Sequence, residues 1–423
     1  MAILFLFIVF FVTISIGVPI GFAIGGATLL TFMIYSEMPT IVVAQFSVTG
    51  LDSFPMMAIP FFILAGAIMG AGGVAKRLID AAIGFIGFIT GGLGAVVAVA
   101  SMFFAAISGS ALATVSAIGG FMIPEMTKKG YDVGYSAALT ACAGTIGVII
   151  PPSIPLVIYG VCTQTSIGDL FLAGIIPGIL IGVGIMIANY FVCKKQGYGA
   201  NEKPQPLKLS LKRLWEAKWA VLTPVIILGG IYAGIFTPTE ASVVAVVYSA
   251  VISLFVYREM SFRMLYKTIV STAVVNGITS FLLGLSSAFA AYLSLENVPK
   301  MLLNALLGVT DNKFLLLLLI NIALLLIGCV VDNIPATIIL SPILLPVAVS
   351  LGLTPVQFGL ILTVNLTIGL VTPPYGCNLF VAAAVANIKM EVMLRKLWPF
   401  LVALFAVLML ITYVPGVTTF ILG

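Results

Sequence analysis

Residues 145–152 read TIGVIIPP, and residues 367–374 read TIGLVTPP. Both segments carry Thr-Ile-Gly followed by Pro-Pro, and 222 residues (367 minus 145) separate them. Two further pairs keep this offset to within one residue: Pro124 with Pro346, and Ala113-Thr114 with Ala336-Thr337. Membrane helices are rich in Gly and Pro, so a single match would arise by chance. Several matches with a shared offset indicate that the chain consists of two related halves.

The composition identifies lipid as the main solvent of these halves. Of the 423 residues, 61% are hydrophobic and 8% are charged, whereas about a quarter of the residues of a soluble domain are charged. The apolar runs, such as Phe314–Val331 and Phe400–Val414, are long and do not alternate with polar residues. Because only helices and closed barrels satisfy their backbone groups in hydrocarbon, and barrel strands alternate, we predict an all-α polytopic membrane protein.

Several kinds of chemistry are disfavoured by the residues present. The chain has no histidine, and its five cysteines show no metal-binding spacing. It lacks the glycine-rich phosphate-binding motif of an ATPase. The net charge of +5 comes from basic residues that lie mostly beside apolar runs, which is an orientation signal rather than a nucleic-acid footprint. We therefore predict neither an enzyme nor a nucleic-acid-binding protein.

The basic residues also set the predicted orientation. The largest polar break, residues 194–218, carries seven Lys or Arg and two Glu, so the positive-inside rule makes it a cytoplasmic loop. It separates a predicted first repeat, residues 1–193, from a second repeat, residues 219–423. The smaller basic breaks at 258–267 and 389–396 fall on the same side only if some apolar runs do not cross the membrane.

Re-entrant hairpins, which enter and leave the membrane on the same side, place all the basic breaks on one side. In the first repeat we predict an in-plane amphipathic helix over residues 74–90 and a hairpin over 92–124 that enters from the inside. The matching elements of the second repeat are an in-plane helix over 296–308 and a hairpin over 314–350 that enters from the outside. A broken transmembrane helix follows each hairpin, over 133–162 and 355–388. Because the hairpins enter from opposite sides, the repeats are inverted, which is an architecture of transporters.

The Pro-Pro pairs mark the predicted helix breaks. Proline lacks a backbone donor and frees upstream carbonyls, so Pro151-Pro152 and Pro373-Pro374 indicate two unwound points whose carbonyls can face a cation. Two simple kinks are the alternative. The first apolar stretch, Met1–Tyr35, similarly reads as one kinked span or as two short helices that meet at Gly17–Pro19.

Polar residues gather at the predicted hairpin tips. In ISGSALATVS (107–116), Ser108 and Ser110 offer oxygen atoms that either bind a small hard cation or mediate close helix packing. In GCVVDNIPAT (328–337), Asp332 is the only acidic residue between Asp311 and Glu391. A carboxylate at membrane depth is costly, so Asp332 either takes part in an ion or substrate site or caps a helix start.

The broken-helix segments that face the tips carry oxygen atoms and almost no formal charge. Their polar residues include Ser153, Thr372, Tyr375 and Asn378. Backbone, hydroxyl and amide oxygens suit a hard cation such as Na⁺, whereas a tight transition-metal site needs His, Cys or several carboxylates. The tips and the breaks together therefore predict sodium sites.

Five segments resemble the large membrane subunit of tripartite ATP-independent periplasmic (TRAP) transporters, and the resemblance runs over nearly the whole chain. These segments are GLDSFPMMAIPFFILAG (50–66), ISGSALAT (107–114), GTIGVIIPPSIPLVIYG (144–160), GIFTPTEA (234–241) and TIGLVTPPYGCNLF (367–380). The resemblance implies a multi-pass protein of the bacterial inner membrane. It also implies an elevator mechanism, in which a mobile domain with both hairpins slides against a scaffold.

The same resemblance implies Na⁺-coupled import of a small organic anion, with sialic acid slightly favoured over a C4-dicarboxylate. Its implied partners are a soluble periplasmic substrate-binding protein and a small four-helix membrane subunit. Four additional spans do not fit before Met1–Tyr35. The chain is therefore similar to the unfused members of the family, which need the small subunit as a separate protein.

The resemblance also implies site residues, carried over by motif. One Na⁺ is expected near Ser108, Ser110, Gly147 and Pro151. A second is expected near Gly328, Asp332, Gly369 and Thr372. The substrate is expected between the tips, near Ser108, Ser153, Asp332 and Asn378.

Other functions fit part of the sequence. A stand-alone divalent-anion/Na⁺ symporter of the wider elevator superfamily would work without a binding protein, and uptake by the chain alone would favour it. A passive channel would give a non-saturating flux without Na⁺ dependence. A membrane-embedded enzyme is disfavoured, because the apolar runs hold no histidine, cysteine pair or carboxylate pair.

Overall fold

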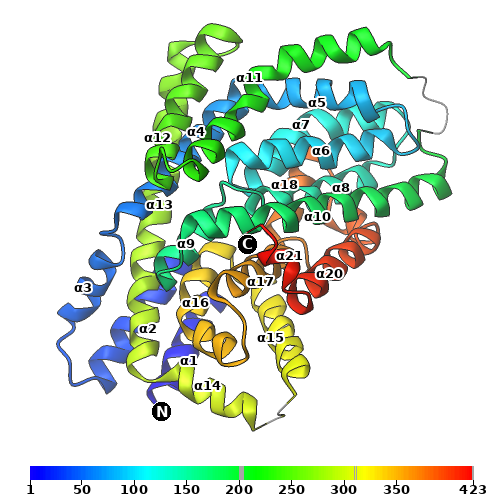
Figure 1. Cartoon of the computed structure of the whole chain (residues 1–423). Helices are drawn as coiled ribbons and strands as arrows, with labels where there is room; N and C mark the ends of the chain where they lie inside the picture. Colours follow the sequence, from blue (N-terminus) through cyan, green and yellow to red (C-terminus); the bar gives the residue numbers. More distant parts are fainter. Residues whose placement is uncertain (200–203, 309, 311, 422–423) are drawn as a thin grey trace.

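The computed structural model describes residues 1–199, 204–308, 310 and 312–421, and the regular elements in these ranges are helices (Figure 1). Six of the described helices are long and apolar enough to cross a membrane: Phe54–Ala71, Ile167–Gln196, Leu207–Tyr232, Pro238–Val256, Phe262–Leu295 and Asn333–Ser350. These findings confirm the predicted all-α polytopic fold.

The first half begins with two helices that pack against each other and are separated by a turn at Gly17. The stretch Met1–Tyr35 therefore forms two helices rather than one kinked span. The elements of this half are α1 (Ala2–Ser15), α2 (Ile20–Tyr35), α3 (Ile41–Thr49), η1 (Phe54–Met57), α4 (Ala58–Ala71), α5 (Val74–Ile86), α6 (Gly92–Ser108), α7 (Ala111–Lys128), α8 (Val133–Gly144), η2 (Thr145–Val148), α9 (Ile154–Thr163) and α10 (Ile167–Gln196).

The second half repeats this order of elements. Its elements are α11 (Leu207–Tyr232), α12 (Pro238–Val251), η3 (Ile252–Val256), α13 (Phe262–Leu295), α14 (Val298–Leu307), α15 (Lys313–Gly328), α16 (Asn333–Ser350), α17 (Pro355–Gly369), α18 (Cys377–Ala386), α19 (Met390–Leu394), α20 (Trp398–Tyr413) and α21 (Gly416–Thr419). The helix pairs α6–α7 and α15–α16 lie at the predicted hairpins. The interruptions between η2 and α9 and between α17 and α18 lie at the two Pro-Pro pairs.

The predicted basic loop over 194–218 is largely helical instead. Helix α10 continues to Gln196, and α11 already begins at Leu207, directly after Pro206. Lys208, Lys212 and Arg213 therefore lie on the first turns of a long helix. The loop prediction was wrong because closely spaced charges do not by themselves end a helix: proline is favoured at a helix start, and Lys and Arg are good helix formers.

Equivalent elements of the two halves make equivalent contacts. Helix α9 packs on α16, and its counterpart α18 packs on α7 and α8. Helix α4 packs on α12, and its counterpart α13 packs on α2, while α10 packs on its own counterpart α20. Figure 1 shows the resulting exchange, with α18 beside the cyan helices of the first half and α9 beside the orange α16. The two halves are therefore related by an internal symmetry, and helices of each half pack against helices of the other.

The two hairpins differ in how closely their helices pair. Helix α6 packs along α7, whereas α15 and α16 share few contacts and each packs along α17. We refer to α6–α10 and α15–α20 as the hairpin bundle, and to α1–α4 and α11–α13 as the flanking helices. The hairpin bundle lies to the right and bottom of Figure 1, and the flanking helices lie mainly to the left and top.

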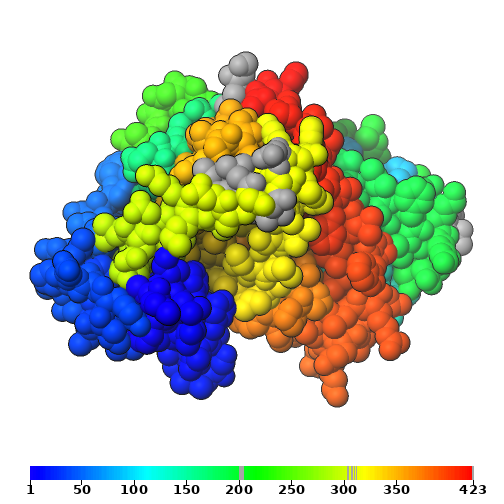
Figure 2. Space-filling view, turned by 90° about the horizontal axis from the view of Figure 1, so that it is seen from below, coloured from blue at the N-terminus to red at the C-terminus, as the bar shows by residue number. Residues whose placement is uncertain are grey.

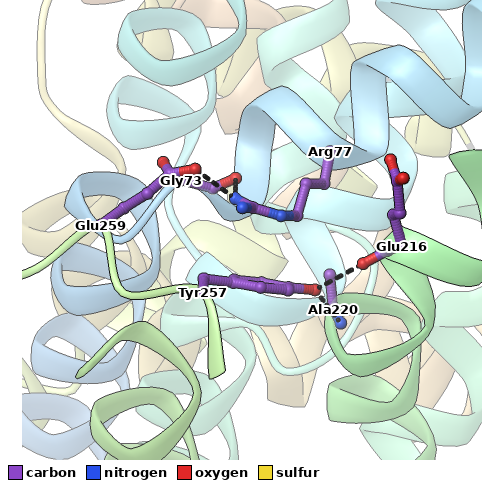
Figure 3. A network of polar contacts seen from close by, with 6 residues as sticks. All are labelled: Gly73, Arg77, Glu216, Ala220, Tyr257 and Glu259. Carbon is purple, nitrogen blue, oxygen red and sulfur yellow. Dashed lines mark hydrogen bonds and ion pairs between the residues drawn. The ribbon is translucent and has the colours of Figure 1, made fainter. Parts of the chain in front are cut away.

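Arg77 fastens α5 to the flanking helices (Figure 3). Its Nη1 atom lies 2.7 Å from Glu259 Oε1 and donates a hydrogen bond to the carbonyl of Gly73 (3.0 Å). Its guanidinium lies 3.8 Å from the centre of the Tyr257 ring. Gly73 has a left-handed φ of 78°, which turns the chain sharply between α4 and α5. These four residues form a clasp that holds the start of α5.

Two further contacts fix the surroundings of this clasp. The Tyr257 hydroxyl accepts a hydrogen bond from the N–H of Ala220 (3.1 Å) and donates to the carbonyl of Glu216 (3.3 Å), so the clasp reaches α11. At the other end of α5, the Ser210 hydroxyl donates to the carbonyl of Gly84 (2.6 Å). Helix α5 is therefore joined to α11 at both of its ends.

The start of α6 is held by a different part of the molecule. The N–H of Gly91 donates to the carbonyl of Tyr198 (3.1 Å), just after α10. The carbonyl of Gly91 accepts a hydrogen bond from the buried side chain of Asn189 on α10 (2.9 Å), and Tyr135 on α8 donates to the Asn189 amide oxygen (2.8 Å). The start of α6 is thus joined to α10, and through Asn189 to α8, within the hairpin bundle.

We expect Arg77→Gln to lower the free energy of unfolding by about 1–2 kcal/mol, because it removes a partly buried ion pair together with a cation–π contact. Thermal unfolding of the purified protein in detergent measures this loss. Lys212→Gln is the matched control, because it breaks an exposed pair on α11 in which Lys212 Nζ lies 3.9 Å from the Glu216 carboxylate. Equal losses of Tm in both variants would contradict the stabilising role of the clasp.

Candidate functional site

The first tip joins α6 to α7 through Gly109, whose left-handed φ of 60° reverses the chain. Ser108 ends α6, and Ser110 caps α7 by accepting a hydrogen bond from the N–H of Ala113 (3.4 Å). One turn into α7, the Thr114 hydroxyl donates to the carbonyl of Ser110 (2.8 Å) and lies 3.2 Å from the Ser108 hydroxyl. The tip therefore gathers three hydroxyl groups beside the carbonyl end of α6.

The first broken helix passes directly against this tip. A Cβ atom added to Gly147 would lie 2.5 Å from the Thr114 hydroxyl oxygen and 2.6 Å from the Ser110 carbonyl oxygen, so only glycine fits there. The structure thus brings the predicted residues Ser108, Ser110 and Gly147 together.

Within the Pro-Pro pair, Pro152 is the residue that approaches the tip. A Cβ atom at Gly109 would lie 2.7 Å from the Pro152 carbonyl oxygen. The ring of the predicted ligand Pro151 lies instead beside α10, where it is 3.6 Å from a Cβ atom built on Gly174. The neighbouring proline was missed because the sequence does not indicate which of the two residues faces the tip.

The second tip repeats this arrangement with a charged cap. Helix α15 ends at Gly328, and Asp332 caps α16 by accepting a hydrogen bond from the N–H of Asn333 (2.8 Å). Asp332 lies 222 residues after Ser110, so the second helices of both hairpins are capped at equivalent positions. The internal symmetry therefore places a carboxylate in the second tip where the first tip has a hydroxyl.

Two glycines bring the second tip against the second broken helix. A Cβ atom on Gly369 would overlap the carbonyl group of Gly328, so this contact requires glycine. Thr372 lies just beyond, and its hydroxyl donates to the carbonyl of Ile368 (2.8 Å). A hydroxyl that donates in this way keeps its lone pairs for a cation. The predicted residues Gly328, Gly369 and Thr372 thus lie where the second tip meets α17.

Buried amide networks beside the second tip were not predicted. Asn333 Nδ2 donates to the Thr367 hydroxyl (3.1 Å), and the Thr337 hydroxyl donates to Asn333 Oδ1 (3.0 Å). Elsewhere on α17, Asn365 Nδ2 donates to the amide oxygen of Asn321 on α15 (2.6 Å). Asparagines within apolar runs are the signal that could have revealed these networks, because buried amides need partners.

Asp332 lines a cavity of about 590 Å³ together with Pro374, Tyr375 and residues of the turn between α1 and α2, such as Val18. Figure 2 shows this part of the molecule, with the N-terminal residues in dark blue next to the second hairpin in yellow. Asp332 therefore caps α16 and also borders a cavity, and its part in an ion or substrate site stays a prediction.

The two other predicted substrate residues use their side chains within the protein. The buried Ser153 hydroxyl donates to the carbonyl of Val148 (2.5 Å) and accepts from the N–H of Leu156 (3.3 Å), which caps α9. The buried Asn378 donates to the carbonyl of Ala141 (3.2 Å), while its Oδ1 atom has no partner among the described residues. Ser153 thus shapes the first break, and Asn378 joins α18 to α8.

Each tip combines two opposite helix ends. The carbonyl end of α6 or α15 favours a cation, and the N–H end of α7 or α16 favours an anion. Among the described residues, no three His, Cys, Asp or Glu side chains come together as a metal-binding group. The oxygen atoms at the tips are hydroxyls, carbonyls and one carboxylate, which suit a hard cation. Such a tip can hold a hard cation next to an anionic group.

Comparison with known proteins identifies the family. Residues 7–417 match the model of the DctM component of tripartite ATP-independent periplasmic transporters. The chain is 46% identical over 418 residues to the isethionate TRAP transporter permease protein DctMQ of Oleidesulfovibrio alaskensis, covering 99% of this chain and 66% of that protein. It is 40% identical over 420 residues to the C4-dicarboxylate TRAP transporter large permease protein DctM of Pseudomonas aeruginosa, covering 99% of this chain and 98% of that protein.

A solved structure supports the fold at a greater distance. The YdaH transporter of Alcanivorax borkumensis superposes with a TM-score of 0.62 at 16% identity, over 89% of this chain and 88% of that one. At this identity the likeness establishes the fold alone. The family match and the sequence relatives, which extend over nearly the whole chain, establish more. The chain belongs to the DctM family, the large permease component of tripartite ATP-independent periplasmic transporters, and is a multi-pass protein of the bacterial inner membrane.

Proposed function

We propose that this chain is the permease of a Na⁺-coupled importer of a small organic anion, and that it works by an elevator mechanism. The observation that carries the proposal is the pairing of each hairpin tip with a broken helix, at two symmetry-related places that bring together helix ends, hydroxyls and glycines. In this scheme one Na⁺ lies near Ser108, Ser110, Gly147 and Pro151. A second lies at Gly328, Asp332, Gly369 and Thr372.

The proposed partners complete the transporter. A soluble periplasmic protein delivers the substrate, and a small four-helix membrane subunit packs against the permease. Family membership supports both partners. The isethionate relative also supports the second one, because a third of its length lies outside the region that this chain matches.

The proposed substrate is a small organic anion that lies between the tips. One relative is named for isethionate and another for C4-dicarboxylates, and both of these compounds are small anions. Sialic acid, which the sequence slightly favoured, stays a prediction. The helix starts at Ser110 and Asn333, together with bound Na⁺, supply the positive potential that an anion needs.

Uptake into proteoliposomes tests the proposal. The chain is reconstituted with its small membrane subunit and binding protein, and labelled isethionate, succinate and sialic acid are offered with and without an inward Na⁺ gradient. We expect uptake of one of these anions that needs both the gradient and the binding protein. Uptake by the chain alone would favour a stand-alone symporter instead. A non-saturating flux without Na⁺ dependence would favour a channel.

Gly147→Ala tests the first sodium site. Its Cβ atom would displace the Thr114 hydroxyl and the Ser110 carbonyl. We expect the Na⁺ concentration for half-maximal uptake to rise about tenfold, which corresponds to a loss of about 1.4 kcal/mol of binding free energy. Gly120→Ala on the same hairpin is the matched control, because a Cβ atom there has no neighbour within 4 Å. A shift of the same size in both variants would remove Gly147 from the site.

Asp332→Asn tests the carboxylate of the second tip. Asparagine caps a helix as well as aspartate does, so insertion and folding should be preserved. We expect the initial rate of uptake to fall about tenfold or more, as for the loss of about 1.4 kcal/mol of ion or substrate binding. Asp132→Asn is the matched control, because Asp132 also caps a helix, α8, by accepting from the N–H of Tyr135, and lies outside the tips. Unchanged uptake by Asp332→Asn would exclude a role of its charge.

A further inference from the structure

A cavity of about 420 Å³ lies between α5, the start of α6, the end of α7 and the start of α11. Its volume falls within the range of small-molecule pockets, about 300–1,000 Å³. None of the residues that line it belongs to a tip or a helix break. It separates an element fastened to the flanking helices, α5, from the first hairpin, so a molecule bound there would contact both.

Charged side chains of both signs line this cavity. They are Lys76 and Asp80 on α5, Glu125 on α7, Lys129 just after α7 and Arg213 on α11. Lys129 has another partner. Within the part of the chain that the structure describes, the other four side chains form no ion pair or hydrogen bond with another group of the chain. Such groups ordinarily pair with one another, so their separation around a cavity leaves two cations and two carboxylates for a ligand.

A side-chain amide oxygen in the wall of the cavity calls for a hydrogen-bond donor on any ligand. The Oε1 atom of Gln205, which also lines it, is buried and has no hydrogen-bond partner among the described residues. A buried acceptor without a partner is unfavourable, so a ligand with an N–H or O–H donor would be favoured there. Burial also raises the pKa of the Asp80 carboxyl, although Arg213 and Lys76 oppose this shift. A bound cation would compensate the burial of this carboxylate.

The rest of the wall is apolar and opens outward. Leu93, Phe88 and Phe121 line the cavity, and the side chains of Phe88 and Phe121 are 37% and 47% exposed. Helix α5 is amphipathic, with Lys76, Arg77 and Asp80 among apolar residues. By the positive-inside rule, the basic residues of this end place it at the cytoplasmic surface, where such a helix lies in the plane of the membrane. Hydrocarbon chains are therefore available next to the charged groups.

We propose that this cavity binds the headgroup of a membrane phospholipid that carries a primary ammonium, such as phosphatidylethanolamine. The phosphate would pair with Lys76 and Arg213, since both are unpaired cations. The ammonium has three N–H donors, which match Asp80, Glu125 and the amide oxygen of Gln205. The acyl chains would lie over Phe88 and Phe121. Neither an anionic headgroup without an ammonium nor a trimethylated one satisfies both sets of partners.

Native mass spectrometry of the purified full chain in detergent tests this site without any transport assay. The protein is titrated separately with phosphatidylethanolamine, phosphatidylcholine and phosphatidylglycerol of identical acyl chains. We expect one phosphatidylethanolamine molecule to bind at least about tenfold more tightly than either other lipid, because only its headgroup has an ammonium that donates hydrogen bonds to the two carboxylates. Equal affinity for all three lipids would overturn the proposal.

Variants identify the place of binding. We expect the double variant Asp80→Asn/Arg213→Gln to lose the preference for phosphatidylethanolamine, whereas Lys212→Gln, on the exposed side of α11, keeps it. Thermal unfolding of each variant without lipid shows whether the fold is intact. If Asp80→Asn/Arg213→Gln does not fold, Glu125→Gln is measured instead, with the same expected loss. A preference that survives the substitutions in folded protein would overturn the proposal.

Soluble glycerophosphoethanolamine distinguishes a lipid site from a site for a free headgroup. We expect it to displace the lipid only at concentrations far above those at which phosphatidylethanolamine binds, because it makes no contact with Phe88 and Phe121. Equal potency of the soluble compound would overturn the lipid assignment. None of these outcomes bears on sodium-coupled uptake, so the proposed transport function stands or falls independently.

Discussion

Backbone polar groups cannot remain unpaired in hydrocarbon, and the architecture of this permease follows from that constraint. Two hairpin tips and two helix breaks interrupt regular hydrogen bonding in the interior of the chain. Each tip lies against a helix break: Gly147 meets Ser110 and Thr114, and Gly369 meets Gly328. The first break is therefore enclosed by protein, whereas Pro374 and Tyr375 of the second break are exposed and line the cavity at Asp332. The contacts between the tips and the helix breaks also bring together oxygen atoms of the kind that bind a hard cation.

The internal symmetry produces two versions of this arrangement that differ chemically. Ser110 and Asp332 occupy equivalent capping positions, but only the second brings a formal charge. The hairpins differ as well, since α6 and α7 pack along each other, while α15 and α16 diverge around α17. The two halves thus share the order of their helices but differ in the side chains at equivalent positions. A cation at the second tip would meet a carboxylate, whereas a cation at the first would meet neutral oxygen atoms.

The repeat and the composition were enough to predict the all-α fold, the two helix pairs at the hairpin positions and the interruptions at the Pro-Pro pairs, because these signals act locally. The inverted orientation of the two halves stays a prediction. Contacts between distant segments were not predictable in this way. The sequence does not indicate that the Pro152 carbonyl approaches Gly109 at the first tip, or that Asn378 bonds to Ala141. It also concealed the start of α11 among charged residues. The clasp at Arg77 joins residues 182 positions apart (259 minus 77), and only the fold brings them together.

The fastening of α5 and α6 to different parts of the molecule has a mechanical consequence. Ser210 holds Gly84 to α11, and Asn189 holds Gly91 to α10. Any displacement of the hairpin bundle relative to the flanking helices must then be absorbed by the six residues 85–90 (FIGFIT), or one of these hydrogen bonds must break. This short segment would then act as a hinge between α5 and the first hairpin, and α5 would stay with the flanking helices. In such a displacement, the length of this segment would limit how far the first hairpin could move.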